Sequence, residues 1–135
     1  MTPFGIADAG LVIAWADCQT SREDRRWADN ALESGPLYTT EPVLAEISHF
    51  IGVTPVAVLL NSGRLVVGMA LADHGKFIAD FAVQYPEADL ADISLVKLSE
   101  LHPRLKVFTV DAADFTIYRR FRNQPVPISV PPSRQ

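Results

Sequence analysis

The chain has 135 residues and a formal net charge of −4, and 48% of the residues are hydrophobic while 21% are charged. This length predicts one domain, and this composition is typical of a globular protein and not of a disordered one. The acidic balance argues against broad electrostatic binding to nucleic acid, although a local basic patch or a bound cation would still allow it.

The cysteine content and the distribution of apolar residues exclude several further classes. Cys18 is the only cysteine, which excludes an intrachain disulfide framework and a cysteine zinc cluster and fits a reducing cytoplasm. No apolar run reaches about 18 residues without a charge or a breaker, so we expect no membrane span. The N-terminus lacks a basic region followed by a hydrophobic stretch, and we expect no signal peptide and a cytoplasmic location.

The N-terminal part of the chain predicts a strand, two helices and a second strand, in that order. Residues 4–8 are apolar and end at an acid, which predicts a buried strand, and a short helix is expected over 9–17. Ser21 as an N-cap and Gly35 as a stop signal predict a helix between them. The segment "PLYTT" that follows predicts the second strand.

The central part continues with helices and a third strand. Thr40 is placed to cap a helix that ends at Gly52, with a proline early enough to be tolerated. Residues 54–63 repeat the Thr-Pro start and the glycine stop, which predicts another short helix. The compact segment "RLVVGM", over 64–69, predicts the third strand, and a helix is expected over 70–85.

The C-terminal part predicts one more long helix and one more central strand. A helix is expected from Asp89 to about residue 101, followed by a strand over 105–111 that again ends at an acid. A short helix or turn is expected over 112–121. Residues 126–135 are rich in proline, which predicts an edge strand and a frayed tail.

Strands and helices alternate along the whole sequence. This pattern predicts a mostly parallel sheet of four to five strands with helices on both faces, an α/β/α sandwich of three layers. The sequence contains no repeat, low-complexity tract or linker, so residues 1–135 are expected to form one domain.

Four acids are candidates for a common site. Asp8 and Asp111 end the first and fourth expected strands, and in open parallel sheets ligands bind beyond the carboxyl ends of the strands. Asp92 lies in the first turn of the helix before the fourth strand. Glu46 lies close to the apolar stripe of its helix and is therefore expected to point inward.

Each of these acids also has a plain structural interpretation. Most acids in any chain are surface residues, and Asp89 and Asp114 are placed to cap a helix and a turn. Acids that directly end buried strands are uncommon, which favours a function for Asp8 and Asp111. The spacing alone does not decide between a structural and a functional role for Glu46 and Asp92.

Converging carboxylates without counter-charges would repel one another, and the pKa of each would rise. A divalent cation removes this cost, and oxygen ligands favour Mg²⁺ or Mn²⁺ over zinc. Because Mg²⁺ binds one or two carboxylates together with phosphate oxygens, such a site suggests the chemistry of phosphate esters.

Four segments of the sequence carry a family resemblance. They are "IADAGLVIAWAD", "YTTEPVLAEISHFI", "DLADISLVKLSE" and "FTVDAADF", and they follow one another between Ile6 and Phe115. In this order they resemble the four motifs of PIN-domain ribonucleases, in particular the VapC-like toxins of type II toxin–antitoxin modules.

The resemblance implies a PIN-like sandwich and a Mg²⁺- or Mn²⁺-dependent endoribonuclease that leaves a 5′-phosphate and a 3′-hydroxyl. It implies that Asp8 and Asp92 are the principal metal ligands and that Glu46 and Asp111 complete the acidic pocket. Thr109 matches a hydroxyl residue that orients a water or a carboxylate. The lesser acidic candidates are Asp89 and Asp114, and Ile93 stands where the family usually has a small residue.

The resemblance also implies partners. RNA is the expected substrate, and the basic cluster of Arg119, Arg120 and Arg122 is expected either to contact its phosphates or to form a solvated turn. The apolar region "VLAEISHFIGVTPVAVLL" is richer in hydrophobic residues than two short helices need. We therefore expect it to bind a cognate antitoxin and to contribute to a homodimer.

Two other functions remain open at this point. A housekeeping RNA-processing nuclease of the PIN type would have the same acids. A non-catalytic receiver-like module on a similar sheet is less favoured, because the third expected strand ends without an acid and Lys106 stands at the beginning of the fourth expected strand instead of following it.

Overall fold

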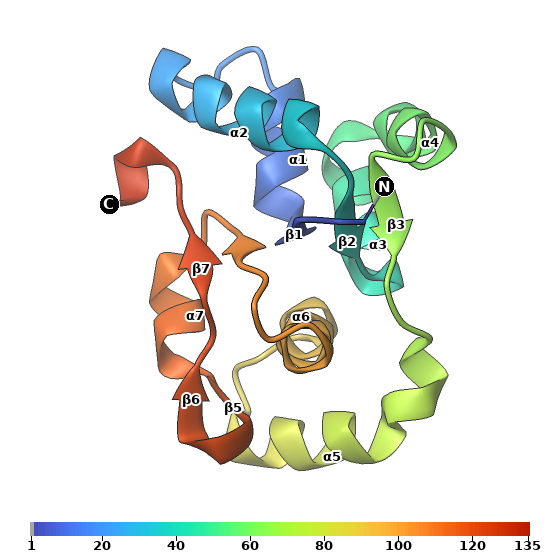
Figure 1. The fold of residues 1–135 in the computed structure, drawn as a ribbon, viewed down its shortest axis with the longest axis vertical. Coiled ribbons are helices and arrows are strands. Elements are labelled where there is room, and N and C mark those ends of the chain that lie inside the picture. Colours follow the sequence, from blue (N-terminus) through green and yellow to red (C-terminus); the bar gives the residue numbers. More distant parts are fainter. Residues whose placement is uncertain (1) are drawn as a thin grey trace.

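The computed structural model, which describes residues 2–135, contains a central five-stranded parallel sheet (Figure 1). Its strands, in the order in which they lie side by side, are β3 (Leu65–Val67), β2 (Leu37–Thr39), β1 (Gly5–Ala7), β4 (Val107–Phe108) and β7 (Ile128–Ser129). Every neighbouring pair is parallel. The expected parallel sheet is confirmed, with strands shorter than the apolar segments that encode them.

Helices cover both faces of this sheet. The helices before β3 are α1 (Ala9–Ala16), α2 (Arg22–Ser34), α3 (Glu41–Ile51) and α4 (Val53–Asn61). Those after it are α5 (Gly75–Gln84), α6 (Leu90–Leu101) and α7 (Ala112–Ile117). Parallel strands are joined by right-handed crossovers, which sends the two groups to opposite faces. Figure 1 shows α1, α2 and α4 on one side of the sheet and α5, α6 and α7 on the other, a three-layer α/β/α fold.

The core lies where α6 meets the sheet. Ile6 of β1, Leu37 of β2 and Val107 of β4 are fully buried, as strands covered on both faces must be. On α6, Leu95 and Leu98 are also fully buried. This helix contacts β1 as well as α3 and α5, so it is surrounded by protein on most sides and positions whatever its first turn carries.

Of the four capping residues expected from the sequence, Ser21 and Asp89 are N-caps with a side-chain hydrogen bond, whereas Thr40 and Asp114 are not. Ser21 accepts a hydrogen bond from Asp24 N at 3.3 Å, and Asp89 caps α6. Thr40, expected to cap α3, makes no capping bond. Its Oγ1 instead lies 2.7 Å from Ser94 Oγ on α6, because both hydroxyls are buried and each satisfies the other. This contact ties the start of α3 to the first turns of α6.

A β-hairpin that the sequence did not indicate follows α7. The short helix expected over 112–121 ends at Ile117, and β5 (Arg119–Arg120) then pairs with β6 (Gln124–Pro125) in an antiparallel hairpin. Arg122 and Asn123 at its tip have φ angles of 57° and 56°, the left-handed backbone conformation that tight hairpins use.

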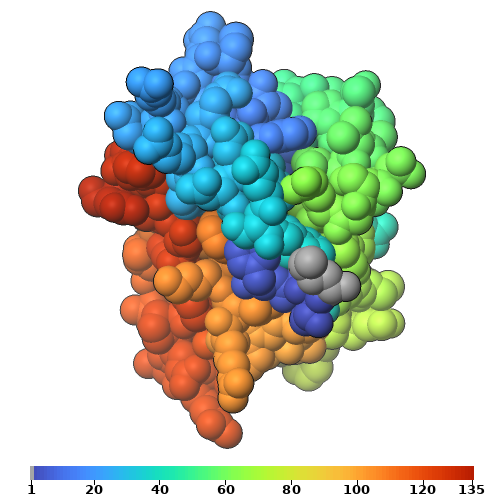
Figure 2. Space-filling model, turned by 45° about the horizontal axis from the view of Figure 1, so that its top comes forward, coloured from blue at the N-terminus to red at the C-terminus, as the bar shows by residue number. Residues whose placement is uncertain are grey.

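The C-terminal tail lies against α2 instead of extending freely. Beyond β7, residues Pro132–Arg134 form a 3₁₀ turn, η3, in which the Ser133 backbone N–H donates to Asp24 Oδ1 at 3.1 Å. Trp27 Nε1 donates to Ser129 Oγ at 3.1 Å. Figure 2 shows the C-terminal residues alongside the helix that carries these partners. A frayed tail was expected, and these bonds hold it in place. Two further 3₁₀ turns in the described residues are η1 (Leu71–His74) and η2 (Phe121–Asn123).

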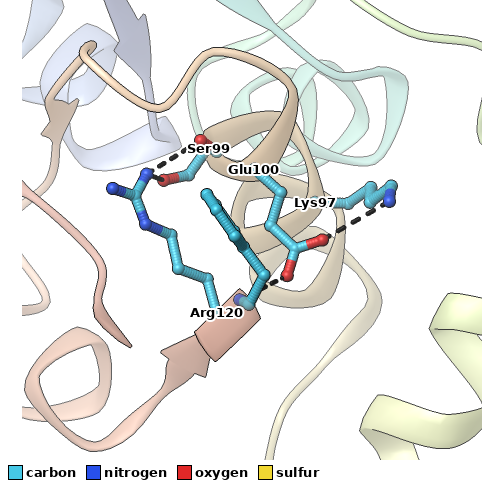
Figure 3. Close-up of polar contacts among 5 residues, drawn as sticks. Lys97, Ser99, Glu100 and Arg120 are labelled. Atoms are coloured by element: carbon cyan, nitrogen blue, oxygen red, sulfur yellow. Dashed lines mark hydrogen bonds and ion pairs between the residues drawn. The ribbon is translucent and has the colours of Figure 1, made fainter. Parts of the chain in front are cut away.

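Arg120 fixes the hairpin to the C-terminal end of α6 (Figure 3). Its Nη1 donates to Ser99 O and Ser99 Oγ, both at 2.9 Å, and its Nη2 donates to Pro103 O at 3.0 Å. Beside it, Glu100 accepts from the Phe121 backbone N–H at 2.8 Å. The side chain is buried, and a cation is favourable at the C-terminal end of a helix.

We expect Arg120→Met to lower the free energy of unfolding by about 2 kcal/mol, because buried carbonyl and hydroxyl acceptors would lose a charged donor. Urea unfolding followed by circular dichroism measures this loss. Arg122→Met is the matched control, since that side chain is exposed at the hairpin tip and its loss should change stability by less than about 0.5 kcal/mol. Equal losses in the two variants would contradict a structural role specific to Arg120.

None of the helices in residues 2–135 has the length and apolarity that crossing a membrane requires.

Candidate metal centre

The first acid of the site stands at the end of the central strand. Asp8 follows β1, is 7% exposed, and serves as the N-cap of α1. Its Oδ1 accepts from the Ala9 backbone N–H at 2.7 Å, and its Oδ2 accepts from Thr109 Oγ1 at 2.6 Å. Because β1 and β4 are neighbours, the residues that follow them meet at the same edge of the sheet. Thr109 therefore orients a carboxylate, as expected.

The segment after β4 brings in two more acids. Thr109 Oγ1 accepts from the Asp111 backbone N–H at 2.9 Å, so one hydroxyl links Asp8 to the start of α7. Asp111 is the N-cap of α7, and its Oδ1 lies 3.4 Å from the Asp114 backbone N. Asp114 therefore lies in the first turn of α7 and is not its cap.

A glycine allows α1 to approach this segment closely. A Cβ atom built on Gly10 would lie 2.5 Å from Cγ2 of Val110, the residue between Thr109 and Asp111. Real Cβ contacts are longer, so a side chain at position 10 would force the Val110 side chain to move. The absence of a side chain at Gly10 thus allows α1 to pack against the segment that carries Asp111.

The third part of the site is the first turn of α6. Asp89 Oδ1 accepts from the Asp92 backbone N–H at 2.9 Å, which makes Asp89 the helix cap. The side chain of Asp92 accepts from the Tyr118 hydroxyl at 2.6 Å. Asp92, Asp111 and Asp114 each offer one oxygen atom, and these three atoms lie within 4.8 Å of one another.

Glu46 approaches the site from α3. The hydroxyl contact between Thr40 and Ser94 holds α3 against α6, and the Glu46 side chain is half-buried. Burial is the largest cause that raises its pKa, followed by repulsion from Asp8, Asp89 and Asp111. Glu46 also lines an open groove of about 720 Å³ with Asp89. The other residues of this groove are Glu41, Pro42, Ala45, Leu71, Leu90 and Ala91.

Burial and neighbouring carboxylates raise the pKa values of Asp8 and Asp92. Burial is the main cause for Asp8, with added repulsion from Asp111 and Asp89, while hydrogen bonds from Thr109 and Ala9 act in the opposite direction. The pKa of Asp92 is raised to about 7: burial is the main cause, the hydrogen bond from the Tyr118 hydroxyl acts in the opposite direction, and repulsion from Asp89, Asp8 and Asp111 adds to the rise. The acids named from the sequence are therefore close enough to interact electrostatically.

Asp114 and Tyr118 are affected by the same charges. The side-chain hydrogen bond with Asp111 is the main cause that raises the pKa of Asp114, ahead of burial. Burial, and then the hydrogen bond to Asp92, raises the pKa of Tyr118. The phenol consequently keeps its proton and remains a donor to the carboxylate.

The donor set fits a hard divalent cation. Every candidate ligand supplies a carboxylate oxygen, the kind of ligand that Mg²⁺ and Mn²⁺ prefer, and the cluster of three oxygens contains neither histidine nor cysteine. A cation would also offset the repulsion and burial that raise these pKa values.

The three arginines of the basic cluster differ in their surroundings. Arg120 is 9% exposed, and its Nη1 and Nη2 donate to acceptors of Ser99 and Pro103, which argues against the contact with phosphate that was expected for it. Arg119 Nη1 donates to Thr116 O at 2.7 Å and to Tyr118 O at 3.0 Å. Arg122 is exposed, so a phosphate contact stays a prediction for Arg122 and, less directly, for Arg119.

Tyr118 is the polar residue of the site that sequence reasoning missed. It stands at the C-terminal end of α7, in the sequence "FTIYRRF", where it reads as one more apolar side chain. Its spacing from Asp111 places it two turns along a helix from the N-cap, which was the available signal.

No protein-family model matches the chain, and no curated protein matches it. The strand order β3-β2-β1-β4-β7 differs from the order 2-1-3-4-5 of the receiver-like arrangement, which argues against the non-catalytic alternative.

Proposed function

We propose that this protein is a Mg²⁺- or Mn²⁺-dependent endoribonuclease of the PIN type. The observation that carries the proposal is a group of acids beyond the carboxyl ends of β1 and β4: one oxygen each of Asp92, Asp111 and Asp114 lies within 4.8 Å of the other two, and the charge of Asp8 adds to the repulsion that raises the pKa of Asp92. These acids come from distant parts of the chain, and two of them are raised in pKa by burial and mutual repulsion. Perturbed carboxylates at the ligand-binding edge of a parallel sheet are typical of catalytic sites.

In the proposed site Asp8 and Asp92 are the principal metal ligands, and Glu46 and Asp111 complete the pocket. The bound ion would stabilise negative charge on the scissile phosphate and lower the pKa of a water molecule. Thr109 fixes Asp8 Oδ2, which sets the direction of that carboxylate. The acids that surround this group, Asp89 and Asp114, add negative charge and keep the cation in place.

The groove beside Glu46 is the proposed path of the substrate. It is open, and its walls combine apolar side chains such as Pro42, Leu71 and Leu90 with acids. Unpaired RNA exposes base faces that suit apolar walls. Phosphates would be repelled by the acids, so the bound cation and Arg122 at the hairpin tip must offset that repulsion.

A partner protein is proposed for the outer surface of α3 and α4. Phe50 and Val53 are 64% and 70% exposed, and Val58 and Leu60 are 53% and 41% exposed, so a cluster of apolar side chains faces solvent. We propose that this surface binds a cognate antitoxin and contributes to a homodimer, which would make the nuclease a toxin. A housekeeping nuclease would share the acids and would not need an antitoxin.

Cleavage of a mixed RNA pool tests the proposed function. We expect products with Mg²⁺, none with EDTA, and a loss of more than about 100-fold in Asp8→Ala, because outer-shell changes alone typically cost roughly 10- to 100-fold. Glu33→Ala is the matched control: this acid is exposed near the end of α2, which leads into the start of β2, at the opposite edge of the sheet. Cleavage that survives chelation or the Asp8 substitution would overturn the mechanism.

A further inference from the structure

Tyr118 is held rigidly at the end of α7. The residue is 4% exposed. Its ring makes edge-to-face contacts with Phe115, Phe81 and Tyr85, with centroid distances of 5.4, 5.5 and 5.5 Å. Aromatic pairs in this geometry are favourable and leave a side chain little freedom to move. The position of the phenol oxygen is therefore set by the aromatic contacts of the ring and not by the acids.

The hydroxyl of this fixed ring meets Asp92. It donates to Asp92 Oδ2 at 2.6 Å, a short bond of the kind made to a charged carboxylate. Within residues 2–135, no hydrogen bond to Asp92 Oδ1 is present. One oxygen of the carboxylate is thus held by the protein, and the other is left for a ligand.

Asp8 is also oriented by a hydroxyl, although both of its oxygens accept a hydrogen bond, Oδ1 from the Ala9 backbone N–H at 2.7 Å. The Thr109 hydroxyl donates to Oδ2, also at 2.6 Å. Both hydroxyls belong to the segment that runs from the end of β4 to the end of α7. Each of the two proposed principal ligands is therefore oriented by an O–H donor from one continuous part of the chain.

We propose that Tyr118 is a positioning residue, which holds Asp92 Oδ2 so that this carboxylate is oriented for a divalent cation before the cation arrives. The inference rests on the proposed function, because it assigns a role within that site. Residues that hydrogen-bond to metal ligands fix their direction, and their loss typically weakens metal binding roughly 10- to 100-fold. Tyr118 acts through Asp92 and does not touch the substrate.

Mn²⁺ binding to the purified protein, measured by electron paramagnetic resonance, tests this role without RNA. Tyr118→Phe keeps the ring and removes only the donor, and we expect its affinity for Mn²⁺ to fall about tenfold. Tyr85→Phe is the matched control: Tyr85 belongs to the same aromatic cluster, but its hydroxyl accepts from the Arg119 backbone N–H at 3.2 Å. That variant should bind Mn²⁺ like the unaltered protein.

A double-mutant cycle with Asp92→Asn separates positioning from general loosening. If Tyr118 acts through Asp92, Tyr118→Phe should weaken Mn²⁺ binding little further once Asp92 has been replaced. A loosened fold would weaken binding by the same factor with Asp92 present or replaced, and would do so in Tyr85→Phe as well; either result overturns the role of Tyr118. Unchanged affinity in Tyr118→Phe overturns it too. If the unaltered protein binds no Mn²⁺, the proposed function fails together with this inference.

Discussion

An Asp92→Asn variant is expected to lose RNA cleavage by more than about 100-fold and yet to be more stable than the unaltered protein when both are free of metal near neutral pH. The loss follows from removing the charge of a proposed metal ligand. The gain follows because Asn has the shape of Asp, can still accept from the Tyr118 hydroxyl, and carries no charge into a group of acids.

The size of this gain follows from the raised pKa of Asp92. Burial and repulsion move it from an ordinary value of 3.8 to about 7 in the folded protein. Each pKa unit corresponds to about 1.4 kcal/mol, but Asp92 is only part-buried, and solvent screening reduces the expected gain to about 1–2 kcal/mol.

The sign of the effect depends on pH. Below 3.8 the carboxyl is protonated in both states, and it costs no stability. Between 3.8 and about 7 the unfolded chain loses the proton first, so the stability of the unaltered protein falls as pH rises, and above that range the full cost is present. Thermal unfolding in EDTA across this range, with Glu33→Gln as the control, measures it. A difference between Asp92→Asn and the unaltered protein that does not grow with pH would contradict the assignment.

Mg²⁺ is expected to offset the loss of stability that these charged acids cause. An ion that binds only the folded state, at a free concentration about 100 times its dissociation constant, stabilises the protein by about 2.7 kcal/mol. Differential scanning calorimetry should therefore detect a rise in melting temperature on adding Mg²⁺ at about pH 8, and a much smaller rise at about pH 5, where Asp8 and Asp92 hold more of their protons.

Two controls make this result specific. Sodium chloride at equal ionic strength corrects for general screening of the acids. Asp8→Asn should not respond to Mg²⁺, whereas Glu33→Gln should respond fully. A rise of equal size at both pH values, or in Asp8→Asn, would mean that the ion binds elsewhere.

The sheet and the edge that carries the acids could be predicted from the sequence. Short apolar segments alternate with amphipathic ones, and the topology of parallel strands then dictates that the residues after β1 and β4 lie together. Asp8 and Asp111 were accessible by this argument because each ends an expected strand; in the structure Asp8 directly follows β1, whereas β4 ends at Phe108, three residues before Asp111. Asp92 and Glu46 lie within helices, and their approach to the site depends on how α3 and α6 pack.

The features that the sequence did not reveal all depend on contacts between distant segments. Nothing at Thr40 indicates that its hydroxyl would find Ser94 on another helix instead of its own backbone. The hairpin has no Asn-Gly or Asp-Gly at its turn, the usual signal, and uses Arg122 and Asn123 in the left-handed conformation instead. Arg120 looked available for phosphate because its acceptors, on α6 and at Pro103, become known only once the hairpin is placed.

The positions of the acids along the chain determine when, during synthesis of the protein, the proposed site can be complete. Asp8 emerges from the ribosome with the first strand, whereas Asp92, Asp111 and Asp114 belong to the last third of the chain, and β4, the neighbour of β1, is made late as well. For most of translation, a nascent chain still attached to its own messenger RNA therefore carries only Asp8 and Glu46 of the four proposed site acids. Under the proposed function, the nuclease would gain its activity only when the transcript that encodes it has been read almost to the end.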